Sequence, residues 1–364
     1  MSLFLIFYFV LFFTSFILLI LHFITWKEGK GKSFNEFPFV SVLIAARNEE
    51  SRILSCLMAL DKLDYPKDKI EILVGDDLSE DGTKAVVVEY IKDKPGFQLC
   101  EITERKGVAK GKANVLAHLA HKATGEFFFI TDADIEVPAT WVKGLLGHWN
   151  EKIATVSGVT MIAGDRVFDK LQCLEWILAF GMVQTVSERG VPVSAVGNNM
   201  MISRKAYEST GGYENIPFSV TEDFELFRQT LAKGWGYKNI MEPEVLASSK
   251  AIPDLMGLLK QRKRWMNGAL KIPFILVLCL VLKAVFFPMI LLTLFLFPYW
   301  GALLWLTKIL MQEVFMALVI KRMGVKESLL KYFLLFEIYS GVISFVVLLY
   351  NMLPVKVEWK GRKY

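Results

Sequence analysis

The sequence predicts an α/β domain combined with membrane-spanning helices, and three observations predict it. An uncharged apolar stretch opens the chain, and a second apolar region fills its last third. Between them, short apolar runs alternate with helical stretches, a pattern typical of a layered fold with a mostly parallel sheet and flanking helices. The 364 residues leave room for one sizeable soluble domain beside the membrane part.

The opening stretch, Leu3 to Trp26, contains no Lys, Arg, Asp or Glu. It is long enough to supply the roughly 20 apolar residues that cross a bilayer. A cleaved secretory signal would begin with positive charge and end at small residues, whereas no basic residue precedes this stretch and it ends in tryptophan. We therefore expect residues 1–26 to form a retained N-terminal transmembrane helix rather than a signal peptide.

About three further transmembrane helices are expected within residues 272–353, with spans at Ile272–Phe297, Pro298–Ile320 and Leu329–Tyr350. Charged residues interrupt these spans, namely Lys283, Lys308, Glu313, Lys331 and Glu337. The first three are interpreted as functional groups inside the membrane, as side chains that reach its interface, or as signs that the span ends lie elsewhere. The basic, amphipathic segment 251–271 is typical of a helix lying in the membrane interface.

The charge distribution predicts a multi-pass protein of the cell (inner or plasma) membrane whose middle domain, residues 38–250, faces the cytosol. Lys27, Lys30 and Lys32 directly follow the first helix, and such residues mark the cytoplasmic side. Four spans would place the tail, residues 354–364, outside, although its basic residues favour the inside. The two indications agree if one apolar stretch is interfacial or re-entrant.

Composition and motifs exclude several classes of protein. The net charge of +5 comes from scattered or juxtamembrane lysines, which does not form the basic face of a nucleic-acid-binding protein. The four cysteines have neither metal-ligand nor redox spacing, and the histidines form no metal pattern. The first turn, Arg47-Asn48-Glu49-Glu50, lacks the glycines of a dinucleotide-binding enzyme, and no P-loop is present.

Acidic residues follow two of the predicted strands. Asp76-Asp77 comes after the strand at residues 70–75, and Asp132-Ala133-Asp134 comes after the strand at 126–130. Ligands of open α/β sheets bind at the carboxyl ends of the strands. Carboxylates there can hold a divalent metal ion that neutralises a nucleotide diphosphate. Ordinary surface-turn aspartates are the alternative, which is less probable for two clusters than for one.

Six motifs in order carry a resemblance to the family 2 glycosyltransferases with the GT-A fold, especially the membrane-bound inverting type. Together they span Val40 to Lys271. They are the strand and turn Val40–Glu50, the aspartate motif Asp76–Thr83, the element Gly111-Lys112-Ala113-Asn114, the DxD Asp132-Ala133-Asp134, Thr221-Glu222-Asp223, and the QxxRW motif Gln261–Trp265. The chain departs from the family at Leu78, where Gly or Ser is frequent.

The resemblance implies a role for each motif. It implies that the donor is bound by Ala46, Asn48, Glu49, Asp76, Asp77, Lys112 and Asp132. It also implies that Asp134, with Asp132, binds the metal ion, Mg²⁺ or Mn²⁺. Catalysis falls to Asp223 as general base, with Glu222 beside it and Arg264 at the leaving diphosphate. The acceptor side, or gate, falls to Gln261, Trp265 and Asn198.

Each role has a simpler alternative. Asp76 and Asp77 could cap a turn, and Lys112 could be a solvated lysine at a helix start. Asp223 could simply stabilise the N-terminus of a helix, because a negative charge is favourable there. Gln261, Arg264 and Trp265 share one face of a helix, which could be a basic interfacial helix with an aromatic anchor.

The sequence thus predicts an inverting, metal-assisted glycosyltransferase that moves a hexose or N-acetylhexosamine from a UDP-sugar to a lipid or lipid-linked acceptor. Few membrane spans argue against the channel that a processive polymer synthase needs. A polysaccharide synthase of the poly-N-acetylglucosamine type stays open as an alternative. A non-catalytic transporter or scaffold is the alternative from a different class.

Overall fold

The computed structural model describes residues 1–25, 29, 31–32, 36–269, 272–325, 327–355, 358–359 and 362–363. The expected juxtamembrane Lys27 and Lys30, Trp26, the end of the 251–271 segment and most of the basic tail lie outside these residues. The chain divides into two units. The helical unit comprises residues 1–28, 162–193 and 251–357, and the sheet unit comprises residues 29–161, 194–250 and 358–364.

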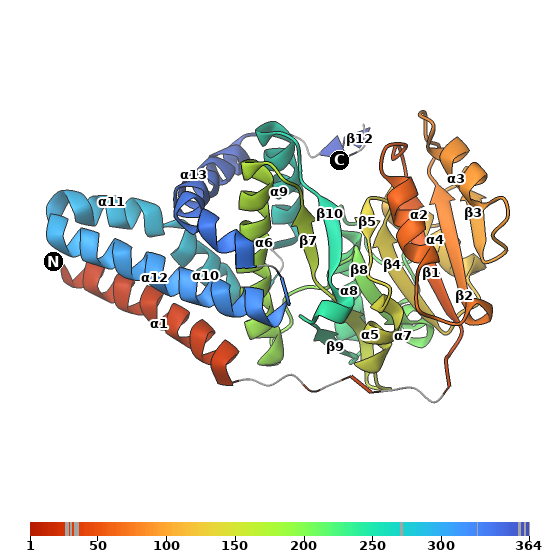
Figure 1. Cartoon of the computed structure of the whole chain (residues 1–364), viewed down its shortest axis with the longest axis horizontal. Coiled ribbons are helices and arrows are strands. Elements are labelled where there is room, and N and C mark those ends of the chain that lie inside the picture. The colour runs from red at the N-terminus through yellow and green to blue at the C-terminus, as the bar shows by residue number, and fades with distance from the viewer. Residues whose placement is uncertain are drawn as a thin grey trace. The chain divides into compact units, whose positions relative to one another are not determined.

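The sheet unit is built on seven strands in the order β3-β2-β1-β4-β8-β6-β9 (Figure 1). β1 pairs in parallel with β2 and β4, β2 with β3, and β6 with β9, whereas β8 is antiparallel to β4 and β6. The expected mixed, mostly parallel sheet is confirmed. The strands are β1 (Val40–Ala46), β2 (Ile70–Asp76), β3 (Phe97–Glu101), β4 (Phe127–Asp132), β6 (Ile153–Ser157), β8 (Asn199–Ser203) and β9 (Gly236–Asn239).

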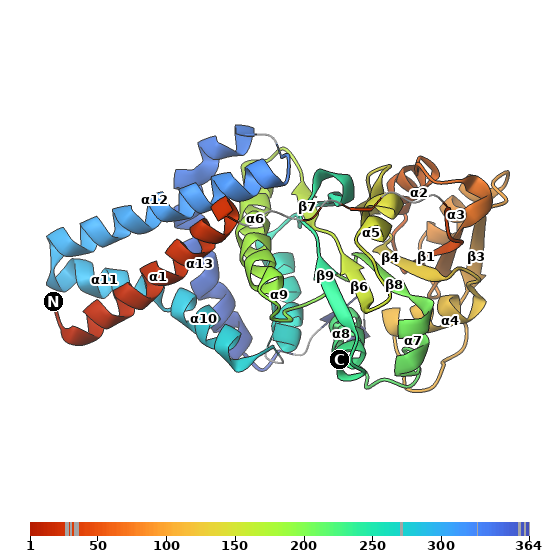
Figure 2. The same ribbon diagram turned by 90° about the horizontal axis from the view of Figure 1, so that it is seen from below.

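Helices cover both faces of this sheet (Figure 2). On one face lie α2 (Ile53–Asp61), α3 (Thr83–Ile91) and α5 (Trp141–Gly147), and on the other lie α4 (Lys112–Lys122) and α7 (Arg204–Thr210). Further elements are α8 (Glu222–Ala232), β7 (Thr160–Ala163), and the antiparallel pair β5 (Ile135–Glu136) and β10 (Ala247–Lys250).

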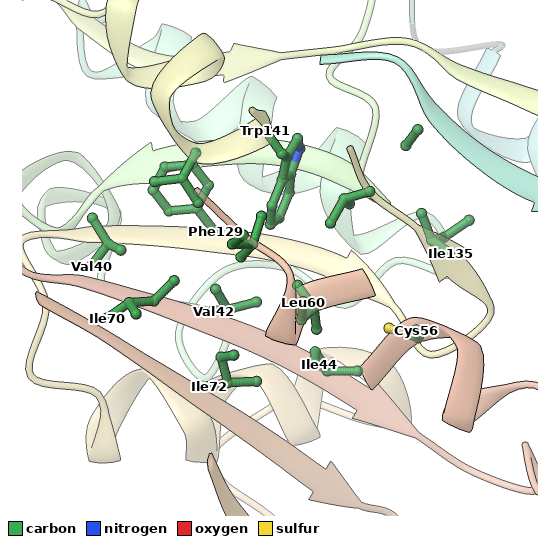
Figure 3. Packing of buried hydrophobic residues seen from close by; sticks show 14 of the residues in the cluster. Val40, Val42, Ile44, Cys56, Leu60, Ile70, Ile72, Phe129, Ile135 and Trp141 are labelled. Carbon is green, nitrogen blue, oxygen red and sulfur yellow. The ribbon is translucent and has the colours of Figure 1, made fainter. Parts of the chain in front are cut away.

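The core under α2 and α5 explains the continuous apolar run of β1, because a strand covered on both faces needs apolar side chains on both. Val42 and Ile44 of β1 are fully buried there, beside Leu60 of α2 (Figure 3). The rings of Phe129 and Trp141 meet edge to face with centroids 5.2 Å apart. Burying one such side chain stabilises the fold by roughly 1.5–3 kcal/mol.

The helical unit contains the long apolar helices at both ends of the chain and one helix from its middle. α6 (Val167–Glu188) packs against α12 and α13, which is why residues 162–193 group here and interrupt the expected continuous domain 38–250. The other helices are α1 (Leu3–Thr25), α9 (Leu255–Ala269), α10 (Phe274–Ala284), α11 (Phe286–Leu296), α12 (Pro298–Arg322) and α13 (Phe333–Met352).

Among the residues that the structure describes, three helices are long and apolar enough to cross a membrane: Leu3–Thr25, Pro298–Arg322 and Ser328–Met352. A fourth span exists if the pair formed by α10 and α11, bent by 41°, counts as one broken span rather than a re-entrant loop. One N-terminal helix and about three C-terminal ones agree with the fold class expected from the sequence.

The expected span over Ile272–Phe297 consists of two short helices with a bend between them. α10 and α11 have 11 residues each, about 16 Å, which is half of a bilayer core. The break follows from Pro288 in the first turn of α11, because a proline ring clashes with the carbonyl four residues earlier, here that of Ala284 at the end of α10.

Candidate active site

Three strands of the sheet unit end at one edge and bring the predicted site segments together. In the sheet register Ala46 lies opposite Asp76, and Ala45 lies opposite Asp132. Because β1, β2 and β4 are parallel, the turns that follow them share this edge. The first turn, the aspartate motif and the DxD are therefore neighbours, as the sequence predicts.

The first turn and the aspartate motif interlock through hydrogen bonds. Ala46 accepts from the backbone N–H of Asp77 at 2.9 Å. The backbone N–H of Asn48 donates to Ser79 Oγ at 3.0 Å, and that of Glu49 donates to Thr83 Oγ1 at 2.8 Å. Ala46, Asn48 and Glu49 thus hold the loop that follows β2 in one conformation.

The two aspartates of that loop are placed differently. Asp76 is 5% exposed, and its carboxylate accepts from the backbone N–H of Ser79 at 3.2 Å and from Ser79 Oγ at 2.5 Å. Asp76 therefore caps the turn, the simpler of its two expected roles. Asp77 is also buried, and the guanidinium of Arg47 donates to its backbone carbonyl and, at 3.1 Å, to that of Leu78.

Leu78 is the residue at which the chain departs from the pattern that the resemblance implies. Its φ of +54° lies in the left-handed region, and its side chain is exposed. A residue with a Cβ pays roughly 1–2 kcal/mol for that conformation, whereas glycine adopts it freely. The backbone at Leu78 therefore favours glycine, one of the two residues that the resemblance leads us to expect here.

Lys112 joins two segments that are far apart in the sequence. It is the first residue of α4, and its Nζ lies 2.6 Å from Asp132 Oδ1 and 2.9 Å from Glu222 Oε1. Its side chain is 14% exposed, so it is not a solvated lysine. Burial opposes its charge, but Asp132, Glu222 and Asp223 outweigh burial and raise the pKa of Lys112. We call these four residues the Lys112 cluster.

The DxD carboxylates are each paired with a cation. Asp132 contacts Lys112, and Asp134 Oδ2 lies 3.1 Å from Arg52 Nη1. Within the described residues no three carboxylate, histidine or cysteine side chains form a metal site. Mg²⁺ is commonly held by one or two carboxylates together with substrate phosphates. Asp132 and Asp134, both partly exposed at the strand edge, fit that arrangement.

Asp223 lies in the first turn of α8 and is held by two backbone donors. The N–H of Phe224 donates to Oδ1 at 2.8 Å, and the N–H of Gly197 donates to Oδ2 at 2.9 Å. A Cβ at position 197 would stand 2.3 Å from Oδ2, so glycine is required there. Burial and the charge of Glu222 raise the pKa of Asp223 to about 6, against the opposing effects of Lys112 and the two N–H groups.

Asn198 lies beside the end of β4. Its backbone carbonyl accepts from Thr131 Oγ1 at 3.0 Å, and its side-chain Oδ1 accepts from Thr160 Oγ1 at 2.9 Å. These two hydrogen bonds hold Asn198 in place. The residue before it, Gly197, donates its N–H to Asp223.

The QxxRW segment belongs to α9 of the helical unit. Its basic residues differ in the partners that they contact. Arg262 binds Glu175 through two hydrogen bonds of 3.0 Å and lies over the Trp265 ring at 4.5 Å. Gln261 Oε1 accepts from Arg262 at 2.8 Å. Lys263 donates to the carbonyl of Leu353. Arg264 makes no hydrogen bond or ion pair with any residue that the structure describes.

Sequence reasoning missed two arginines of the strand edge. Arg47 and Arg52 both lie in the turn between β1 and α2, and neither belongs to a spacing that predicts contact with Asp77 or Asp134. Only the register of the sheet reveals these contacts.

Comparisons with known proteins indicate the family of the chain. A family model described as glycosyl transferase family 21 matches residues 6–364. The beta-monoglucosyldiacylglycerol synthase of Trichormus variabilis is 29% identical over 66% of this chain and 50% of its own length. The poly-beta-1,6-N-acetyl-D-glucosamine synthase of Staphylococcus epidermidis is 24% identical over 63% of this chain and 54% of its own length. The chain thus spans about half the length of these relatives.

Among solved structures, the mannosyltransferase PcManGT of Pyrobaculum calidifontis, in complex with GDP-Man and Mn²⁺, is similar over 96% of this chain and 99% of its own, with a TM-score of 0.59. At 18% identity this likeness shows the fold alone. The matches confirm the glycosyltransferase assignment made from the motifs, although the matching family model is numbered 21 and the motifs were compared with family 2.

Proposed function

The chain belongs to glycosyl transferase family 21, and from that membership we propose that it is an inverting enzyme that moves a hexose or N-acetylhexosamine from a UDP-sugar to the hydroxyl of a lipid or lipid-linked acceptor. The observation that supports this most is the Lys112 cluster. It brings a strand-end carboxylate, Asp132, together with the acidic pair Glu222 and Asp223 around one buried cation.

We propose Asp223 as the general base. Inversion requires a group that takes the proton of the acceptor hydroxyl as its oxygen attacks the anomeric carbon. The N–H groups of Gly197 and Phe224 hold the carboxylate in a fixed orientation. A pKa of about 6 makes it more basic than an ordinary carboxylate while leaving it mostly ionised at pH 7.

Donor binding is proposed for the strand edge. Asp77 is the residue we propose to contact the nucleoside, since Asp76 is engaged within the turn. Asp132 and Asp134 would hold Mg²⁺ or Mn²⁺, which when bound neutralises charge on the diphosphate. Arg264 is proposed to stabilise the leaving diphosphate, because no described residue neutralises it.

The acceptor is proposed to be a lipid on the cytosolic side of the membrane. Three to four membrane-spanning segments accompany the sheet unit, and the relative from Trichormus variabilis is named for glycolipid synthesis. The relative from Staphylococcus epidermidis is named for a polymer, so a polysaccharide product is the second candidate.

The test is incubation of membranes carrying the chain with radiolabelled UDP-glucose or UDP-N-acetylglucosamine, with Mg²⁺, with Mn²⁺ or with a chelator, followed by solvent partition. We expect metal-dependent label in the organic phase. Asp68→Asn, which changes an exposed carboxylate just before the amino end of β2, opposite the end that carries Asp76, is the matched control for variants of the site. Label in insoluble or high-mass aqueous material would contradict the lipid acceptor.

A further inference from the structure

Tyr213 carries a buried hydroxyl that no role described above uses. The residue is 2% exposed, and its hydroxyl has no hydrogen-bond partner among the residues that the structure describes. Its own backbone N–H donates to the hydroxyl of Tyr207 at 3.1 Å, and the two rings lie 5.7 Å apart. The surroundings therefore fix the ring and leave its polar end unsatisfied, an arrangement that calls for an explanation.

The loop that carries Tyr213 lies between α7 and α8 and is held against the approach to α4. Gly211 and Gly212 adopt positive φ values of +87° and +73°, which turn the chain just ahead of the tyrosine. The carbonyl of Glu214 accepts from the N–H of Val108 at 3.0 Å. The segment that carries Tyr213 and leads to Glu222 and Asp223 thus contacts the segment that leads to Lys112.

The charges around the hydroxyl select the chemistry of its partner. Burial, and then the nearby carboxylates of Glu222, Asp223 and Asp132, raise the pKa of Tyr213 well above 10, so the phenol remains a hydrogen-bond donor. Three carboxylates against the single cation of Lys112 repel an anionic partner. A hydroxyl fits better, because it can accept from a phenol and donate to a carboxylate at once.

We propose that Tyr213 donates a hydrogen bond to a hydroxyl group of a sugar bound at the Lys112 cluster, and so helps to determine which sugar is accepted. The inference rests on the proposed glycosyltransferase function of that cluster. The sugar hydroxyl could belong to the donor or to a sugar-bearing acceptor, and the experiment separates the two.

The test is Tyr213→Phe in the full-length protein, purified in detergent. Without ligand, we expect it to unfold at the same temperature as the wild type or higher, because an unpaired buried hydroxyl has been removed. With the UDP-sugar, we expect kcat/KM to fall about 2- to 13-fold, the range for one neutral hydrogen bond.

Tyr65→Phe is the matched control. Tyr65 is also buried, but its hydroxyl donates to the carbonyl of Pro38 at 2.6 Å. This variant should show the opposite pattern, with a lower unfolding temperature and an unchanged kcat/KM.

Deoxygenated substrates identify the hydroxyl. Removing the hydroxyl that Tyr213 binds should lower the rate of the wild type and have little further effect on Tyr213→Phe. Such coupling with one deoxy-UDP-sugar places the bond on the donor, and coupling with one deoxy-acceptor places it on the acceptor.

Two results would overturn the inference. One is a Tyr213→Phe protein that is less stable with an unchanged kcat/KM, which would mean that the hydroxyl has a structural partner such as water. The other is the absence of coupling with every deoxy-substrate. Failure of the proposed function is distinct, since the wild type itself would then neither transfer sugar nor gain stability from a UDP-sugar.

Discussion

Lys112→Met removes the one cation of the Lys112 cluster and should affect both stability and pH dependence. Methionine has a similar length but no charge, so Asp132, Glu222 and Asp223 would face one another without compensation. Removing one member of a buried ion pair costs about 3–5 kcal/mol. Since about a third of the Asp132 side chain is exposed, solvent screens part of its charge and we expect about 3 kcal/mol, the lower end.

The pH dependence follows from the sign of the interaction. The charge of Lys112 lowers the pKa of Asp223, which burial and Glu222 raise to about 6. In the wild type, kcat/KM should therefore fall as the pH drops through about 6, because a protonated carboxyl cannot accept a proton. Without Lys112 the pKa of Asp223 rises further, so this acidic limb should move to higher pH.

The assay is the rate of sugar transfer from pH 5 to pH 8.5, together with thermal unfolding of the same protein. Asp68→Asn, in an exposed position, should leave both measurements at their wild-type values. A Lys112→Met protein whose acidic limb coincides with that of the wild type would refute the assigned coupling between Lys112 and Asp223.

Two further predictions concern stability. Leu78→Gly should raise the free energy of unfolding by about 0.5–1 kcal/mol in denaturant titration, because relief of the left-handed strain exceeds the entropic cost of glycine; a lower stability would contradict this. Lys308→Met should destabilise the protein by about 3–5 kcal/mol, because Glu337, 3% exposed, would lose its buried cation. Stability should largely return in Lys308→Met/Glu337→Gln, because the amide removes the charge and keeps an acceptor for Trp305 and Gln312, and the exposed Lys331→Met should have no effect; an unstable double variant would count against the ion pair as the cause.

The sequence predicted the parts of the fold that depend on local pattern. Apolar runs bounded by polar turns located β1, β2 and β4, and the acidic residues after them lie at one edge of the sheet, where ligands of open α/β sheets are expected. The QxxRW motif was likewise placed on a helix, α9. These features succeed because a single segment contains the whole signal.

Features that depend on distant segments could not be predicted. Nothing near Asp134 or Arg52 in the sequence indicates that they pair, since the contact depends on the register of β1 and β4. The bend between α10 and α11 had a local signal in Pro288, but the apolar composition around it outweighed that signal. The Tyr213 hydroxyl, buried with no partner among the described residues, has no sequence pattern, because its surroundings depend on how the loop packs.

The most direct test of the proposed mechanism is sugar transfer by Asp223→Asn. Asparagine keeps the size of the side chain but cannot act as a base, so we expect transfer to fall by about 10²- to 10⁴-fold, with binding of the UDP-sugar and cooperative unfolding retained. Transfer by Asp223→Asn at the wild-type rate would contradict the general-base assignment on which the proposed mechanism depends.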